Sequence, residues 1–145
     1  MRSATAGDLA AIKAIEKDTA GAAHWSVAQY AALIEPNSAK VLLVACEGEL
    51  VVGFLVGQSA GVEWEVENVV VVESRRRRGT ATTLMREFVD LARGRGANSL
   101  FLEVRESNRA ARQFYERMQF FAVGRRVGYY GDPVEDAIIY RLNLK

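Results

Sequence analysis

A run of valines followed by a run of arginines decides the fold: Val69-Val70-Val71-Val72-Glu73-Ser74-Arg75-Arg76-Arg77-Arg78-Gly79-Thr80-Ala81. The valines predict a buried strand, and the small residues from Gly79 onward predict the start of a helix. The first turn of a helix has backbone N–H groups without helical partners and is partly positive. Because Gly79 and Ala81 have little or no side chain, an anion can approach this backbone closely. The stretch therefore predicts a phosphate site between a strand and a helix.

Two common phosphate motifs are excluded at this site. A P-loop requires Gly-Lys-Ser/Thr after the strand, and the glycine spacing here is different. A dinucleotide-binding fold requires Gly-x-Gly-x-x-Gly, which this stretch lacks. The run Arg75–Arg78 would also suit a solvated surface or a nucleic-acid-binding module, and these alternatives stay open.

Hydrophobic spacing on both sides of this stretch predicts the other helices and strands. The predicted elements are a helix with Leu9, Ile12 and Ile15, a helix over 27–35, strands over 40–46, 50–58 and 63–72, a helix around 84–92, a strand over 98–104, a helix capped by Ser107, and strands over roughly 119–129 and 136–143. This order indicates an α+β (mixed α/β) fold with a hairpin-rich sheet and at least one strand-helix-strand crossover.

Local signals define the helix over 27–35 more closely. Ser26 and Gln29 fit a capping box, and Trp25 and Tyr30 fit the hydrophobic pair that flanks such a box. We expect Pro36 and the asparagine after it to end this helix.

The length and composition are those of a globular protein, and we expect a single domain over residues 1–145. Half of the residues are hydrophobic and 26% are charged, with a formal net charge of +1. Residues 1–74 carry four basic and ten acidic side chains, a balance of −6, whereas residues 75–145 carry fifteen and eight, a balance of +7. Because most of the bases are arginines, which bind phosphates through paired hydrogen bonds, the second half favours an anionic partner.

Single cysteine and histidine residues narrow the possible chemistry. Cys46 has no second cysteine to pair with, so a reducing, cytoplasmic location is expected. His24 is the only histidine, and no metal site is expected. We see no signal peptide and no apolar stretch of the ~20 residues that span a bilayer, so we expect no membrane partner.

Several motifs together resemble one enzyme family. Arg76-Arg77-Arg78-Gly79-Thr80-Ala81 matches the Arg/Gln-x-x-Gly-x-Gly/Ala motif of the GNAT family of N-acetyltransferases. The further matches are Leu102-Glu103-Val104, Ser107-Asn108-x-Ala110-Ala111-x-x-x-Tyr115 and Tyr129-Tyr130-Gly131. Within the family the chain resembles the RimI group, bacterial enzymes that acetylate the N-terminal alanine of a small-subunit ribosomal protein. The resemblance covers nearly the whole chain and is densest over residues 66–140.

The resemblance implies a fold and a cosubstrate. The fold is a twisted, mostly antiparallel central sheet of six to seven strands flanked by about four helices, and the cosubstrate is acetyl-CoA. The N–H of Val70 or Val71 would polarise the thioester carbonyl. The implied cofactor-binding residues are Val69, Val70, Val71, Arg76, Arg77, Arg78, Gly79, Thr80, Ala81, Thr82 and Asn108.

Acetyl transfer to an amine needs a base for the amine and an acid for the leaving thiolate. By resemblance Glu103 is the base and Tyr115 is the acid. Glu65 or Glu67, on the preceding strand, could instead act as the base or relay the proton through a water. An α-amine has a pKa near ~7.7–8.0, so a base of modest strength is sufficient.

The resemblance also implies an acceptor site. Trp25, Tyr129 and Tyr130 would flank a groove for a peptide N-terminus, and Glu65 and Glu67 would attract its ammonium group. The expected acceptor is a peptide or protein N-terminal α-amine, possibly on a ribosomal protein, and the alternative is a small-molecule amine. A nucleic-acid partner is not expected, and the protein is expected to be a monomer or a weak dimer.

One residue departs from the family pattern. Gln119 lies where relatives commonly have a glycine after the helix, so the turn at the end of that helix was expected to differ.

Overall fold

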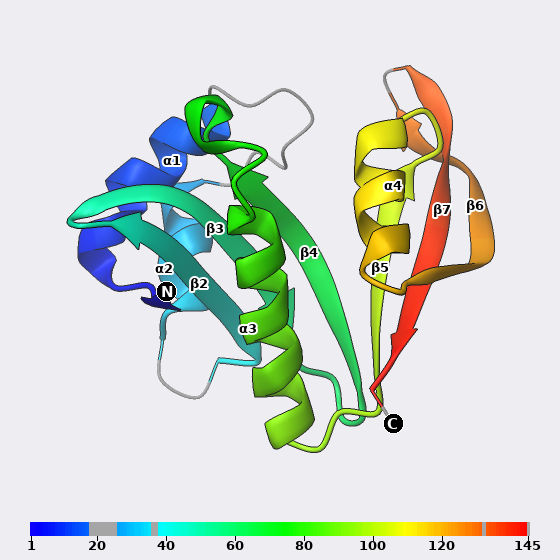
Figure 1. Cartoon of the computed structure of the whole chain (residues 1–145), viewed down its shortest axis with the longest axis horizontal. Helices are drawn as coiled ribbons and strands as arrows, with labels where there is room; N and C mark the ends of the chain where they lie inside the picture. The colour runs from blue at the N-terminus through cyan, green and yellow to red at the C-terminus, as the bar shows by residue number, and fades with distance from the viewer. Residues whose placement is uncertain (18–25, 36–37, 132, 145) are drawn as a thin grey trace.

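A computed structural model describes residues 1–17, 26–35, 38–131 and 133–144, which form a seven-stranded sheet with helices on both faces (Figure 1). The strands are β1 (Arg2–Ser3), β2 (Lys40–Glu47), β3 (Leu50–Gln58), β4 (Glu63–Val71), β5 (Ser99–Arg105), β6 (Phe121–Gly131) and β7 (Val134–Asn143). The α-helices are α1 (Leu9–Lys17), α2 (Val27–Leu33), α3 (Thr80–Gly94) and α4 (Arg109–Arg117), with short 3-10 turns η1 (Ala6–Asp8) and η2 (Glu73–Arg75). The predicted α+β fold, with four helices and a sheet of six to seven strands, is confirmed.

The strand order is β1-β2-β3-β4-β5-β7-β6, and only the central pair β4–β5 is parallel. Helix α3 makes the crossover between these two strands, as predicted. Their register extends only from Glu63 opposite Ser99 to Glu65 opposite Phe101. Beyond this point β4 and β5 diverge (Figure 1). The sheet is therefore joined at one end and parted at the other, between its fourth and fifth strands in spatial order.

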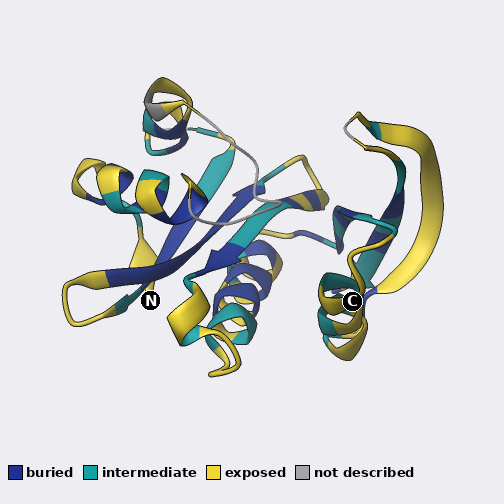
Figure 2. Ribbon diagram, turned by 90° about the horizontal axis from the view of Figure 1, so that it is seen from above, coloured by how far each residue is buried: buried dark blue, intermediate teal, exposed yellow. Residues whose placement is uncertain are grey.

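The two faces of the sheet carry different helices (Figure 2). Helices α1 and α2 cover one face of β2, β3 and β4, where Ile12, Tyr30 and Phe54 are fully buried. The Tyr30 hydroxyl donates a hydrogen bond to the buried Glu16 carboxylate and so ties these two helices together. Helices α3 and α4 lie on the opposite face, where Phe88 of α3 and Leu100 of β5 belong to one core.

Helix α3 lies very close to the sheet because of a glycine. Its buried stripe is Leu84, Met85, Phe88, Val89 and Ala92, which repeats at helical spacing. A Cβ atom on Gly57 of β3 would lie 2.3 Å from the Phe88 ring, so only glycine leaves room for that ring. This close packing holds α3, and with it the loop that precedes the helix, against the centre of the sheet.

The cap of α2 is as predicted, and the cap of α4 is not. Ser26 accepts a hydrogen bond from the Gln29 N–H, and the Gln29 side chain accepts one from the Ser26 N–H. For α4 the predicted cap was wrong by one residue: Asn108 Oδ1 accepts from the Ala111 N–H at 3.2 Å. Ser107 lies outside the helix, and its N–H donates to the Glu135 carboxylate at 2.6 Å.

Several element ends also differ from the prediction. Helix α2 ends at Leu33, and Trp25 and Pro36, predicted to flank it, lie outside the described residues. The short edge strand β1 carries no periodic pattern and was not predicted. The last two strands each extend two residues further into their hairpin than expected, since Gly131 pairs with Val134. None of the helices in the described ranges is long and apolar enough to span a bilayer.

Candidate active site

Strands β4 and β5 stop pairing after Glu65 and Phe101, and we call their separation beyond these residues the parting. The parting leaves one backbone edge of β4 without a partner strand. The Val72 N–H donates to Val52 of β3, and the groups of successive residues point to alternate sides in an antiparallel strand. Val70 therefore points its N–H and C=O toward β3, whereas Val69 and Val71 point theirs toward the parting. In agreement, the Val71 carbonyl accepts a hydrogen bond from Arg76 Nε at 3.1 Å. This alternation favours Val69 and Val71 over Val70 as backbone donors to a ligand.

The arginine run makes a turn whose backbone conformation suits an anion. Arg77 has a φ of 64° and Gly79 a φ of 80°, both in the left-handed region. Gly79 is the N-cap of α3 and has no side chain to bond the helix start. The first helical bond runs from the Thr83 N–H to the Gly79 carbonyl, so the N–H groups of Thr80, Ala81 and Thr82 precede it. These backbone features are the ones that the sequence predicts for a phosphate site at a helix N-terminus.

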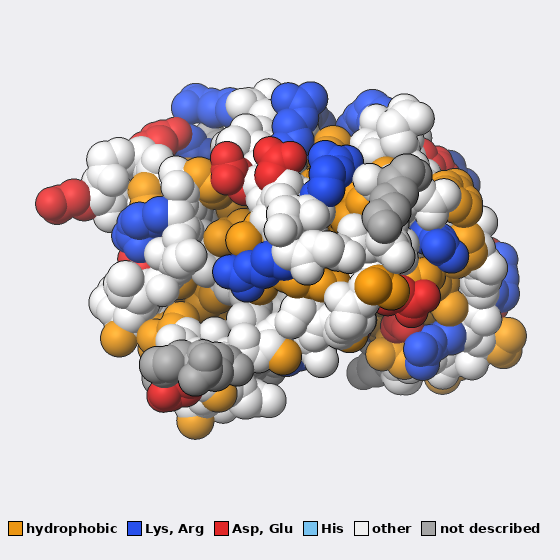
Figure 3. Space-filling model, turned by 90° about the horizontal axis from the view of Figure 1, so that it is seen from below, with side chains coloured by type: hydrophobic (Ala, Val, Ile, Leu, Met, Phe, Trp, Pro, Cys, Tyr) orange, Lys and Arg blue, Asp and Glu red, His pale blue; other side chains and the backbone are white. Residues whose placement is uncertain are grey.

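Two of the four arginines in the run have their guanidinium groups bonded within the chain. Arg75 Nε donates to the Glu47 carboxylate at 2.8 Å, and Arg76 bonds the Val71 carbonyl as described above. The contacts of Arg75 and Arg76 favour a cofactor loop over a nucleic-acid surface for this run. At the opposite end of the molecule, seen from below in Figure 3, lysines and arginines are interspersed with acidic side chains.

Glu103 lies on β5, on the face of the sheet opposite α3 and α4. Its neighbours Leu102 and Val104 point into the core with those helices, so Glu103 points the other way. Its carboxylate forms an ion pair with Arg126 Nε of β6 at 2.7 Å, and its side chain is 19% exposed. No described helix covers this part of the sheet, so the carboxylate is reachable from solvent although it is paired.

Two tyrosines of β6 lie beside Glu103. The Glu103 charge is the main cause that raises the pKa of Tyr129, and it adds to burial in raising the pKa of Tyr130. The guanidinium of Arg126 lies over the Tyr129 ring at 5.3 Å from its centroid. That of Arg105 lies over the Tyr130 ring at 4.2 Å. Both tyrosines thus lie near the predicted base, each under an arginine.

Glu65 and Glu67 of β4 are on the same side of the molecule. Glu65 is paired in register with Phe101, two residues before Glu103. Burial raises the pKa of Glu65, and so do the charges of Glu67 and Glu103. The predicted alternation of exposed and buried side chains along β4 ends at Glu67, which is an extra residue in a β-bulge. The Glu67 carboxylate forms an ion pair with Lys40. Glu65 forms no ion pair with any described residue.

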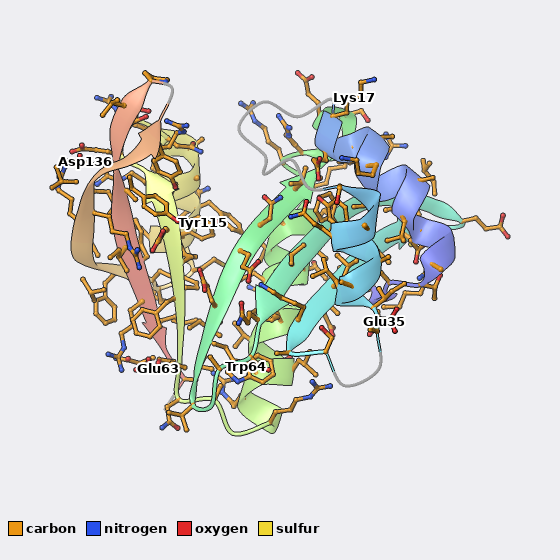
Figure 4. All side chains as sticks on the ribbon, turned by 180° about the vertical axis from the view of Figure 1, so that it is seen from behind. Lys17, Glu35, Glu63, Trp64, Tyr115 and Asp136 are labelled. Atoms are coloured by element: carbon orange, nitrogen blue, oxygen red, sulfur yellow. The ribbon has the colours of Figure 1, made fainter. Side chains whose placement is uncertain are left out.

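Tyr115 approaches the parting from the opposite face, on α4 (Figure 4). Its ring packs against Phe120 at 5.7 Å and lies 6.5 Å from Tyr140, measured between centroids. Burial raises the pKa of the Tyr115 hydroxyl to about 12, and the charge of Tyr130 adds to this. The hydroxyl makes no hydrogen bond with a described residue, so it is free to bond a ligand.

The side-chain amide of Asn108 has two polar atoms, and only its oxygen bonds another described residue. Its Oδ1 caps α4, as described above, while its Nδ2 bonds no described residue. The capping role and a role in ligand binding are therefore compatible for this side chain.

The structure brings most of the predicted site residues together. Glu103, Glu65, Tyr129 and Tyr130 interact electrostatically across β4, β5 and β6. The loop before α3 and the start of α4 lie on the opposite face, on either side of the parting (Figure 1). Trp25 lies outside the described residues. The predicted site residues thus lie on both faces of the sheet, near the point where the pairing of β4 with β5 ends.

Sequence reasoning missed the cations of this site. Arg126 pairs with Glu103, Lys40 pairs with Glu67, and Arg105 pairs with Glu135 at 3.3 Å. Each pair joins residues at least twenty positions apart, so no local spacing could have revealed it.

Comparisons with known proteins agree with this geometry. The sequence profile of the acetyltransferase (GNAT) family matches residues 9–120. A [Ribosomal protein bS18]-alanine N-acetyltransferase from Haemophilus ducreyi is 30% identical over 127 residues, which are 85% of this chain and 88% of that protein. The crystal structure of the ribosomal-protein-S18-alanine N-acetyltransferase from Escherichia coli has a TM-score of 0.87 at 29% identity, covering 99% of this chain and 92% of that one.

A further relative is longer than this chain. An uncharacterized protein from Mycobacterium leprae is 30% identical over 109 residues, which are 72% of this chain and 30% of that protein. The profile match, the relatives and the fold all agree, and the chain belongs to the acetyltransferase (GNAT) family.

Proposed function

We propose that this chain transfers the acetyl group of acetyl-CoA to the N-terminal α-amine of a peptide or protein. The observation that carries this proposal is the position of Glu103. It lies with Tyr129 and Tyr130 on a face that no described helix covers, while Tyr115 approaches from the other face. An extended peptide can lie along such a face with its terminal amine at the carboxylate. The names of the similar enzymes indicate the N-terminal alanine of ribosomal protein bS18 as the acceptor to test first.

The residues at the parting fit acetyl-CoA, which supplies an acetyl group as a thioester when bound. The open backbone at Gly79 and the first N–H groups of α3 suit its pyrophosphate, because nothing lies within 4 Å of a Cβ built on Gly79. The backbone of Val69 and Val71 and the free amide of Asn108 suit the pantetheine arm. The Val71 N–H is the donor that points at the developing oxyanion in this proposal.

Glu103 takes up the proton that the attacking amine must lose. Arg126 balances its charge, and only 19% of the Glu103 side chain is exposed. An α-amine loses its proton near pH ~7.7–8.0, so a carboxylate is a sufficient acceptor once the nitrogen has begun to bond carbon. Glu65, which forms no ion pair with a described residue, would attract the ammonium form to the site.

Tyr115 is the acid in this proposal. With a pKa of about 12 its hydroxyl remains protonated throughout the physiological range, so it can always donate to the leaving sulfur. A thiolate has a pKa of about 8–9, so it holds a proton less tightly than this phenolate does. The hydroxyl would therefore stabilise the leaving sulfur through a hydrogen bond, and the thiolate would take its final proton from solvent.

The remaining parts of the proposal concern the whole protein. We place the activity in one domain over residues 1–145, acting in the cytoplasm as a monomer or a weak dimer. Size-exclusion chromatography with light scattering would measure the mass in solution and test the last point.

The test of the function is a comparison of acceptors. Purified protein is incubated with acetyl-CoA and either synthetic peptides that differ in their first residue or a panel of polyamines, amino acids and aminoglycosides. Mass spectrometry then locates the acetyl group. We expect transfer to the α-amine of peptides, best with the bS18 N-terminal sequence. Turnover of small amines alone would contradict the proposal, and it would favour the acidic side chains of β4 as a binding site for a compact cation.

A further inference from the structure

Strand β6 carries Tyr129 and Tyr130, and its regular pairing with β7 is interrupted beside these residues. In the β6–β7 ladder Arg126 is opposite Ala137 and Tyr130 is opposite Glu135. Three residues of β6, 127–129, therefore lie opposite a single residue of β7, Asp136. A bulge of this kind changes where the following side chains point.

Asp136 holds this bulge through its side chain. One carboxylate oxygen accepts a hydrogen bond from the Gly128 N–H at 2.8 Å, and the other accepts from Arg125 Nη1 at 2.8 Å. Both contacts hold the pKa of Asp136 below its usual range. Gly128 has a φ of 62°, which a residue with a side chain rarely adopts. The shape of the bulge thus depends on one carboxylate and one glycine.

The same network reaches the start of α4. Arg125 also donates two hydrogen bonds to the Glu106 carboxylate, at 2.8 and 2.9 Å. Glu106 follows β5, and its N–H donates to the Asp136 carbonyl at 3.1 Å. The bulge is therefore anchored to the turn that leads into Asn108.

The bulge has a visible effect on the tyrosines. Neighbouring residues of a regular strand point to opposite faces of the sheet. Tyr129 and Tyr130 are neighbours, yet their rings lie 5.1 Å apart in an edge-to-face arrangement, and both lie within the electrostatic reach of Glu103. Without the bulge only one of them could face the carboxylate.

We infer that Asp136 is a positioning residue for the acceptor: by holding Gly128 it turns both Tyr129 and Tyr130 toward Glu103. The pair forms an aromatic wall beside the base, against which the first residues of the acceptor peptide lie. This inference rests on the proposed function, and it adds a residue that touches neither substrate. Asp136 lies at the parted end of the molecule, far from Trp64 at the joined end (Figure 4).

The kinetic test compares variants on both sides of the bulge contact. Asp136→Ala removes the acceptor of the Gly128 N–H, and Gly128→Ala strains the same turn while leaving Asp136 in place. In both we expect KM for the acceptor peptide to rise about tenfold, as for the loss of one good contact, with kcat and KM for acetyl-CoA nearly unchanged. Asp136→Asn should recover much of the loss, because its amide oxygen can still accept from Gly128.

The matched control is Asn143→Ala on the same strand. Asn143 is exposed and accepts a hydrogen bond from Arg141 Nε at 2.8 Å, so this variant also removes a side-chain contact from β7. We expect it to change neither KM. The inference is overturned if Asp136→Ala and Asp136→Asn both raise KM for the peptide and KM for acetyl-CoA by the same factor. Such a result would indicate a general loss of folding, which affects the binding of both ligands alike.

A second measurement is independent of catalysis. Protein labelled with 3-fluorotyrosine gives ¹⁹F resonances that Tyr129→Phe and Tyr130→Phe assign. Asp136→Ala and Gly128→Ala should shift both resonances, and Asn143→Ala should shift neither. If the wild type acetylates no peptide, the proposed function fails while the resonances still report the tyrosine positions. If the peptide reaction stands and the resonances do not move, the inference alone fails.

Discussion

The two parts of the sheet on either side of the parting are built differently. Strands β2 to β4 have helices on both faces, and β3 is buried along almost its whole length. Among the described helices α4 alone packs on β5, β7 and β6, on one face, and β6 is exposed nearly throughout (Figure 2). The first part offers mainly backbone to the site, and the second offers mainly side chains.

The difference extends to what holds each part together. Around β3 the contacts are apolar, with Phe54, Leu55 and Val56 fully buried. Around β6 ion pairs bridge the strands, among them Glu103 with Arg126 and Arg125 with Asp136. Apolar packing makes a rigid backbone for a cosubstrate, whereas exposed ion pairs contribute little stability and can rearrange as an acceptor binds.

The largest effect is expected from a matched pair of phenylalanines. Phe54 is fully buried in β3, and Phe121 of β6 is 45% exposed. Phe54→Ala should lower the free energy of unfolding by about 3–5 kcal/mol, because it leaves a cavity in a packed core. Phe121→Ala should lower it by less than about 1 kcal/mol. Urea unfolding followed by fluorescence measures both, and similar losses would remove the contrast between the two parts.

The next effect concerns the base on the exposed part. Glu103→Gln should lower kcat/KM for the peptide about 10²- to 10³-fold near pH 7. The loss should shrink above about pH 9, where the acceptor amine is already neutral. Rates at a series of pH values measure this, with the exposed Glu87→Gln of α3 as the control. A loss that is the same at every pH would move the role of base to Glu65 or Glu67.

A smaller effect is expected at the acid. Tyr115→Phe should lower kcat about 10- to 100-fold without weakening acetyl-CoA binding, because the ring and its packing remain. Since burial raises the pKa of Tyr115 to about 12, the wild-type rate should not fall through its ionisation at any pH below that value. Steady-state rates and calorimetric titration with CoA test both points. An alkaline decline in the wild type that disappears in the Phe variant would show that the hydroxyl ionises earlier.

The smallest effect tests the departure at the end of α4. Gln119 has a φ of 74°, so the turn has the shape that glycine would give it, and the expected difference in the turn is not seen. A residue with a side chain is strained there by about 1–2 kcal/mol, partly offset by the greater freedom of glycine when unfolded. Gln119→Gly should therefore stabilise the protein by about 0.5–1 kcal/mol, measured by thermal unfolding. Gln113→Gly within α4 should destabilise it by about the same amount, and a loss in both would contradict this account.

Much of the fold was predictable because its signals are local. The valine run, the glycine after the arginines and the capping pair Ser26 and Gln29 each describe a few neighbouring residues, and each agrees with the structure. Gly48 and Gly61, which lie between the predicted strands, both have the positive φ values of tight turns. The missed edge strand β1 has only two residues, and its existence depends on its partner strand β2.

The candidate site was predictable only as a set of residues. The sequence by itself determined the strand-to-helix loop, the identity of Glu103 and Tyr115 as chemically suited groups, and the pair Tyr129-Tyr130. The tertiary structure decided that β4 and β5 part after Glu65, that Arg126 crosses to Glu103, and that Asp136 turns both tyrosines to one side. The physical reason is that strand order and bulges bring together side chains whose separation along the chain carries no information about their contact.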